Sequence, residues 1–250
     1  MAYVVDSSGS INYKDARNWD ITKEFLVNLT RLFRIGPENV QVAFVLFSTD
    51  ARVEWGLTRY QDETSLINAI RRVPYIGDRT NLNDALYLTR TDVFAPGRGT
   101  RQGALKAAVI LTDGVDNVPT NGTELTLQNA TACKNDNIEL SAIGVSNQVN
   151  EERLQQIVSP PTDTHYYAVD DFQALQTLLD QLGPAMVCEG TLSTFAYREF
   201  RLLGRRICCA CFCGNRPFSN SWEIPASRRL GHNQLLVLCW AGDKVIAYLY

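Results

Sequence analysis

Hydrophobic and polar positions along residues 1–185 form two kinds of segment that follow each other in turn. Short, continuously apolar runs such as 107–112 are typical of parallel strands whose two faces are both covered. Between such runs lie segments with apolar residues at helical spacing, and from 15 to 33 these are Phe25, Leu26, Leu29, Leu32 and Phe33. Strands that alternate with helices predict a parallel sheet with helices on both faces.

This pattern predicts six strands and about as many helices. We expect strands at 2–5, 40–47, 51–55, 107–112, 138–145 and 166–169, and helices at 15–33, 66–73, 81–94, 123–134, 150–158 and 171–182. Only Ser48, Thr49 and Asp50 separate the second strand from the third, which predicts a hairpin and one antiparallel edge strand. The predicted fold class is therefore α/β, a doubly wound, mainly parallel six-stranded sheet.

Charge and cysteine content divide the chain near Gly190. Residues 1–190 carry 16 Lys/Arg against 24 Asp/Glu, whereas residues 191–250 carry eight against three. Five of the seven cysteines lie in the second segment, at Cys208, Cys209, Cys211, Cys213 and Cys239. We expect one α/β domain over 1–189 and a tail of uncertain structure over 190–250, which is either disordered or not a native domain.

Composition excludes several classes of partner. A net charge of -3 offers no general attraction for nucleic acid, and no apolar run is long enough to span or insert into a membrane as a helix. The chain shows no secretory signal at its start and begins inside an expected strand, so we expect upstream sequence to be missing. Three Asn-x-Ser/Thr sequons, at Asn28, Asn121 and Asn129, slightly favour an extracellular glycoprotein.

Polar clusters follow the predicted strands at the edge where open parallel sheets bind ligands. Asp6, Ser8 and Ser10 follow the first strand, and Asp113 follows the apolar run at 107–112. Thr80 precedes the third predicted helix. Carboxylate and hydroxyl oxygens are hard ligands, so this set suits Mg²⁺, Mn²⁺ or Ca²⁺ and is poor for zinc.

The same residues carry a family resemblance. The run Asp6-Ser7-Ser8-Gly9-Ser10 matches the DxSxS signature of the von Willebrand factor A domain superfamily, and Val109–Gly114 resembles its second signature. The segment 77–81 fills the place of the family's threonine loop. The resemblance covers residues 2–189 and is greatest to extracellular A domains of type VI collagen and matrilin-like matrix proteins.

The resemblance implies a metal ion-dependent adhesion site. Ser8, Ser10 and Thr80 would offer hydroxyls, Asp6 and Asp113 would act directly or through water, and a carboxylate from a partner protein would complete the metal shell. The implied function is adhesion or matrix assembly outside the cell, without catalysis. The implied partner is an extracellular matrix or cell-surface protein, and we expect loops around 78–79, 116–119 and 95–103 to shape the surface that binds it.

Two positions depart from the family pattern. Leu82 stands where many members have a second threonine or serine, so we expect the supporting hydrogen-bond network to differ from theirs. Cys188 occupies the second position of a common cysteine pair, whose first member would lie before Met1.

Other interpretations stay open at this point. An intracellular scaffold of the same fold is the closest rival, and a Mg²⁺-dependent hydrolase is a third class. The two histidines, His165 and His232, share no sequence context, which disfavours a zinc site or a histidine base. The cysteines at 208–213 lack the spacing of paired zinc knuckles, and an unrelated or unfolded extension explains that segment better.

Overall fold

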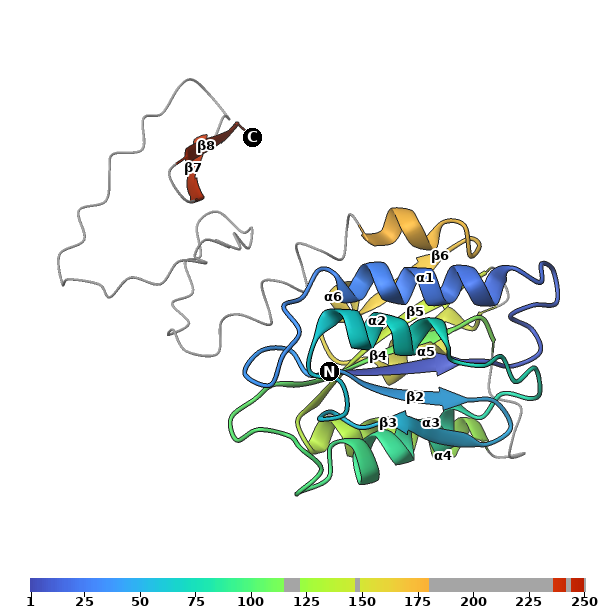
Figure 1. Ribbon diagram of the computed structural model, residues 1–250. Coiled ribbons are helices and arrows are strands. Elements are labelled where there is room, and N and C mark those ends of the chain that lie inside the picture. The colour runs from blue at the N-terminus through green and yellow to red at the C-terminus, as the bar shows by residue number, and fades with distance from the viewer. Residues whose placement is uncertain (115–121, 147–148, 180–235, 242–243, 250) are drawn as a thin grey trace. The chain divides into compact units, whose positions relative to one another are not determined.

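The computed structural model describes residues 1–114, 122–146, 149–179, 236–241 and 244–249. Contacts divide the chain into two units, Met1–Phe195 and Ala196–Tyr250. In the first unit six strands form one sheet in the order β3-β2-β1-β4-β5-β6 (Figure 1). The strands are β1 (Ala2–Asp6), β2 (Ala43–Phe47), β3 (Ala51–Trp55), β4 (Lys106–Thr112), β5 (Ile138–Val145) and β6 (Tyr166–Val169).

All neighbouring strands of this sheet run parallel except one pair. β1 pairs with both β2 and β4, and β5 pairs with both β4 and β6, in parallel register. β3 is antiparallel to β2 and lies at the edge. The predicted fold class, including the antiparallel edge strand from a hairpin, is confirmed.

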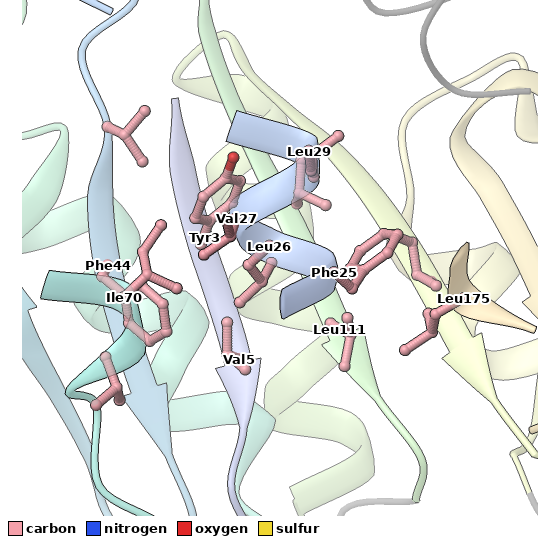
Figure 2. Packing of buried hydrophobic residues seen from close by; sticks show 14 of the residues in the cluster. Tyr3, Val5, Phe25, Leu26, Val27, Leu29, Phe44, Ile70, Leu111 and Leu175 are labelled. Carbon is pink, nitrogen blue, oxygen red and sulfur yellow. The ribbon is translucent and has the colours of Figure 1, made fainter. Parts of the chain in front are cut away.

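The central strand β1 is buried on both faces. Tyr3 and Val5 belong to one hydrophobic cluster, and Ala2 and Val4 to the cluster on the other face. This alternation is the period-2 geometry of a strand, and burial of both faces explains why the run contains no outward-facing polar residue. Figure 2 shows Tyr3 and Val5 packed with side chains from helix α1 (Asn18–Thr30).

The helices cover the two faces of the sheet. α1 and α2 (Glu63–Arg71) pack on the face that contains Tyr3. α3 (Leu82–Leu88), α4 (Gly122–Asn135) and α5 (Glu151–Ile157) pack on the opposite face (Figure 1). Among the described residues of this unit there are also the π-helix η1 (Thr89–Val93) and the short α6 (Thr162–His165), which the sequence did not predict. Residues 175–179 are also helical.

Side-chain caps fix where several helices begin. Asp62 accepts a hydrogen bond from the amide of Ser65 at the start of α2, and Asn150 accepts one from Arg153 at the start of α5. Asn81 caps α3 in the same way, which places the neighbouring Thr80 just outside the helix. Such caps satisfy backbone donors that have no partner within the helix.

Several helices differ from their predicted bounds; for example, α2 begins three residues before the predicted 66. For two others the hydrogen bonds show the reason. The first helix begins at Asn18 rather than at 15. There the side-chain amide of Asn18 donates to Ile11 O, and the backbone amide of Trp19 donates to Asn12 Oδ1. The third is α-helical only to Leu88 and continues as a π-turn, with the Phe94 amide bonded to Thr89 O. Apolar spacing cannot distinguish these local bonding patterns from a regular helix.

In the second unit the structure describes two strands, β7 (Leu236–Ala241) and β8 (Lys244–Leu249), which pair antiparallel. The predicted domain boundary after 189 remains a prediction. Asn121, Asp116, Cys188, His232 and the cysteines at 208–213 lie outside the described residues. Within the described ranges no helix has both the length and the apolar character needed to cross a membrane.

Candidate metal centre

Asp6 ends strand β1 and is completely buried. Its Oδ1 accepts a hydrogen bond of 2.8 Å from the Ser8 amide, and its Oδ2 accepts one of 2.6 Å from the Thr112 hydroxyl. Thr112 is the last residue of β4, the parallel neighbour of β1. Both carboxylate oxygens are therefore held at the carboxyl edge of the sheet, where two strand ends meet.

A chain of hydroxyl contacts joins the first cluster to Asp113. The Oγ atoms of Ser8 and Ser10 lie 3.0 Å apart, and the Ser10 hydroxyl donates to Asp113 Oδ1 at 2.7 Å. Ser8 is buried and Asp113 is 7% exposed, while Ser10 lies at the surface. The cluster thus extends from a buried carboxylate to the solvent.

Thr80 reaches this cluster because its loop is bonded to the Asp6–Ser10 loop. The Gly9 amide donates to Asp78 O at 2.6 Å, and the Gly77 amide donates to Ser7 O at 2.8 Å. A methyl group added to Gly114 would lie 3.7 Å from Ser10 Oγ and 3.8 Å from Thr80 Oγ1. The structure therefore brings all five predicted residues to one place, and Thr80 is almost fully buried there.

The two carboxylates oppose each other electrostatically. Burial, and after it the charge of Asp113, raise the pKa of Asp6 to about 7 against the opposing effect of hydrogen bonds from Ser8 and Thr112. Burial also raises the pKa of Asp113, although the Ser10 hydrogen bond and the charge of Lys14 oppose this shift. Two buried acids side by side disfavour ionisation unless a cation lies between or beside them.

The chemistry of this donor set fits a hard divalent cation. Within the described residues the hydrogen bonds to Asp6 and Asp113 come from neutral groups, so no Lys or Arg hydrogen-bonds to either carboxylate. No three His, Cys, Asp or Glu side chains gather as a metal cluster in that part of the chain, because hydroxyls make up most of this set. Oxygen donors with only two carboxylates suit Mg²⁺, Mn²⁺ or Ca²⁺.

Sequence reasoning missed three residues that support the cluster. The sequence identifies Thr112 only as the end of a strand, yet its hydroxyl donates a hydrogen bond to Asp6. The buried Ser7 hydroxyl accepts from the Ile76 amide at 2.8 Å, and the Tyr75 hydroxyl donates to Ser8 O at 3.0 Å. A hydroxyl at the end of an apolar run, directly before a predicted ligand, is the signal that could have identified Thr112.

Three other acids of the described residues have partners outside the cluster. Asp78 Oδ1 accepts from the Arg79 amide, Asp84 Oδ2 accepts from the Ala51 amide, and Asp92 forms an ion pair with Arg98. None of these contacts involves the five residues of the cluster.

One predicted surface loop was placed at the wrong end of the sheet. The segment 95–103 precedes the start of β4, so it lies opposite the edge that carries Asp6 and Thr112 (Figure 1). There the Arg101 guanidinium donates to Pro37 O and Asn39 O. The sequence indicates a surface loop here, but only the strand direction shows which end of the sheet the loop occupies. The loop 116–119 lies outside the described residues.

The described histidine and cysteine are separate from this cluster. His165 is buried, and its Nε2 lies 2.7 Å from Glu139 Oε1 near the start of β5, at the other end of the sheet. Cys133 is buried on α4, where burial raises the pKa of its thiol to about 12. A thiol with so high a pKa is a poor nucleophile and a poor metal ligand.

Comparison with known proteins gives a consistent result. The family model described as von Willebrand factor type A domain matches residues 1–181. Collagen alpha-1(XII) chain of Notophthalmus viridescens is 33% identical over 179 residues, which cover 72% of this chain and 18% of that protein. Collagen alpha-6(VI) chain of Homo sapiens is 29% identical over 180 residues, which cover 72% of this chain and 7% of that protein.

A solved structure shows the same fold. Proximal thread matrix protein 1 from the mussel byssus, in a structure with a zinc-occupied MIDAS motif, aligns with a TM-score of 0.66 and 26% identity. The alignment covers 75% of this chain and 45% of that one. The chain thus spans less than a fifth of the collagen relatives and under half of the mussel protein.

Proposed function

Because this chain belongs to the von Willebrand factor type A domain family, we propose that it is an extracellular adhesion or matrix-assembly module without catalytic activity. It binds another matrix or cell-surface protein through a divalent cation. The observation that carries this proposal is the convergence of two buried carboxylates and three hydroxyls from three separate segments. The residues that hold the cation are Asp6, Ser8, Ser10, Thr80 and Asp113.

The cation is Mg²⁺ in this proposal, with Mn²⁺ or Ca²⁺ as substitutes. A divalent ion is supported by the mussel protein, whose corresponding motif holds zinc. The preference for Mg²⁺ comes from the oxygen donors of this chain. When bound, the cation supplies an electrophilic position that accepts a carboxylate oxygen from outside.

The chain's own residues prepare this position. Thr112 and the Ser8 amide hold the Asp6 carboxylate by hydrogen bonds, and Ser10 holds Asp113. Only two of the five side chains are acids, so their charge just balances a divalent ion. The bound cation therefore carries no excess negative charge from its protein ligands, so it can attract an acid from a partner protein.

The collagen relatives support an extracellular location for the module. To test the proposed function, we would measure binding of the chain to immobilised extracellular matrix protein in Mg²⁺ and in chelator. Binding should require Mg²⁺ and should be lost in Asp113→Ala. Asp92→Ala removes a partly exposed acid at the other end of the domain and should bind normally. Binding that is equally strong in chelator, or in Asp113→Ala, would contradict the proposal.

A further inference from the structure

Large apolar side chains are exposed at only a few places in the described part of the chain. Two of them belong to the loops that carry the candidate metal ligands. Tyr13 follows the Asp6–Ser10 loop and is 86% exposed, and Ile76 lies on the loop that leads to Thr80 and is 40% exposed. The others are Leu32, Tyr87 and Leu105.

Hydrogen bonds hold both residues close to the metal ligands. The Tyr13 amide donates to Ser10 O at 3.0 Å, and the Ile76 amide donates to the Ser7 hydroxyl at 2.8 Å. Ser7 is completely buried, so this second anchor is shielded from water. The backbone at Tyr13 and Ile76 is therefore fixed relative to Ser8 and Ser10.

The exposure of Ile76 contrasts with the packing of its neighbour Tyr75. Tyr75 packs its ring against Trp19, with the ring centroids 5.9 Å apart, and its hydroxyl bonds to Ser8 O. The hydrophobic residue beside it, Ile76, is instead left in contact with water. Exposing large apolar side chains is unfavourable, and such side chains beside a binding position commonly mark where a partner docks.

Charge at the same edge specifies the polar part of the partner. The side chain of Lys14, next to Tyr13 in the sequence, is exposed and acts electrostatically on Asp113. With a divalent cation bound and its charge balanced by the two aspartates, a partner carboxylate meets both the cation and the positive charge of Lys14. Apolar surface beside a cationic position is complementary to an acid that has a large apolar neighbour.

We propose that Tyr13 and Ile76 form an apolar rim beside the metal position, and that the module selects protein segments in which the metal-binding Asp or Glu adjoins a large apolar residue. This inference rests on the proposed function and adds the chemistry of the partner. Apolar side chains that a partner covers on binding typically contribute more to affinity than the polar contacts around them.

The test is selection from a phage-displayed library of random linear peptides, on the full chain with Mn²⁺ present. The wild type should enrich peptides that contain an acid next to an aromatic or large aliphatic residue. The double variant Tyr13→Ser, Ile76→Ser should enrich acidic peptides without that neighbour. For a peptide enriched by the wild type, each single substitution should weaken binding about tenfold.

Matched controls distinguish binding by the rim from nonspecific hydrophobic binding. Tyr87→Ser and Leu105→Ser remove exposed apolar side chains away from the site, on α3 and before β4, and should leave the enriched sequences unchanged. Tyr13→Phe keeps the ring and should retain most of the affinity.

Two other outcomes would overturn the inference in different ways. The rim would be excluded if the wild type enriched acidic peptides without an apolar neighbour, or if the double variant kept the wild-type preference. The proposed function would stand in both cases. If calorimetry shows that Mn²⁺ binds but no peptide is enriched in a metal-dependent manner, the proposed function fails and the rim with it.

Discussion

The Ser10 hydroxyl donates a hydrogen bond of 2.7 Å to Asp113 Oδ1, although the two residues lie 103 positions apart in the sequence. This contact joins the loop after β1 to the loop after β4. It exists because the two strands are parallel neighbours, so their carboxyl ends lie side by side. The predictions below follow from the cluster around this contact.

Metal affinity should depend on pH because Asp6 must lose its proton before a cation binds. Burial and the charge of Asp113 raise the pKa of Asp6 to about 7. Below this value protons compete with the metal, so the apparent affinity for Mg²⁺ should fall by up to about tenfold per pH unit as the pH decreases from 7. Calorimetric titrations between pH 5.5 and 8.5 would measure this. An affinity that does not change over this range would contradict it.

Without metal, the raised pKa of Asp6 should make the stability of the folded chain depend on pH. The folded state binds the Asp6 proton more tightly than the unfolded chain does, since the pKa is raised from 3.8 to about 7. The contribution of Asp6 to stability should therefore decrease as the pH rises from about 4 to about 7. Denaturant unfolding in chelator should show this decrease, and Asp6→Asn should lessen it. A wild-type slope that Asp6→Asn leaves unchanged would exclude Asp6 as its cause.

Thr112→Val tests the support of Asp6 without changing any proposed ligand. Valine has nearly the same shape but cannot donate to Asp6 Oδ2, which would then lose its 2.6 Å hydrogen bond. Loss of one partner of a buried polar pair costs about 1–3 kcal/mol, so the metal-free chain should lose stability by that amount. Thr131→Val, at an exposed position of α4, is the matched control. Equal unfolding free energies for the two variants would show that the Thr112 hydroxyl is unimportant.

Terbium luminescence should locate the cation. Tyr75 is close enough to the cluster that the charges of Asp113 and Asp6 add to burial in raising the pKa of its hydroxyl. Excitation of the aromatic rings should therefore produce emission from bound Tb³⁺, and Mg²⁺ should compete it away. Asp113→Ala should abolish the signal. Emission that survives this substitution would place the ion elsewhere.

Much of the fold could be predicted because the spacing of apolar residues along the sequence shows which positions are buried. The bounds of β3, β5 and β6 agree with the predicted 51–55, 138–145 and 166–169. The ends of α1 and α3 could not be predicted, since they depend on individual side-chain bonds such as Asn18 to Ile11 O. The location of the loop 95–103 could not be predicted either, because its composition does not show which end of the sheet it joins.

The candidate ligands could be predicted from their positions after strands, together with the family resemblance. Their supporting residues could not. Thr112 and Tyr75 act through contacts with residues 106 and 67 positions away, which no local pattern encodes. The rim formed by Tyr13 and Ile76 was equally hidden, because an apolar residue in a loop sequence is as consistent with burial as with exposure.

The most direct test is the melting temperature of the chain in saturating Mg²⁺ and in chelator, measured for the wild type and for Asp113→Ala. An ion at about 100 times its dissociation constant adds about 2.7 kcal/mol of stability. The wild type should therefore melt about 5–11 °C higher with Mg²⁺, and Asp113→Ala should melt at the same temperature in both conditions. Identical melting of the wild type with and without divalent cation would contradict a metal centre at these residues.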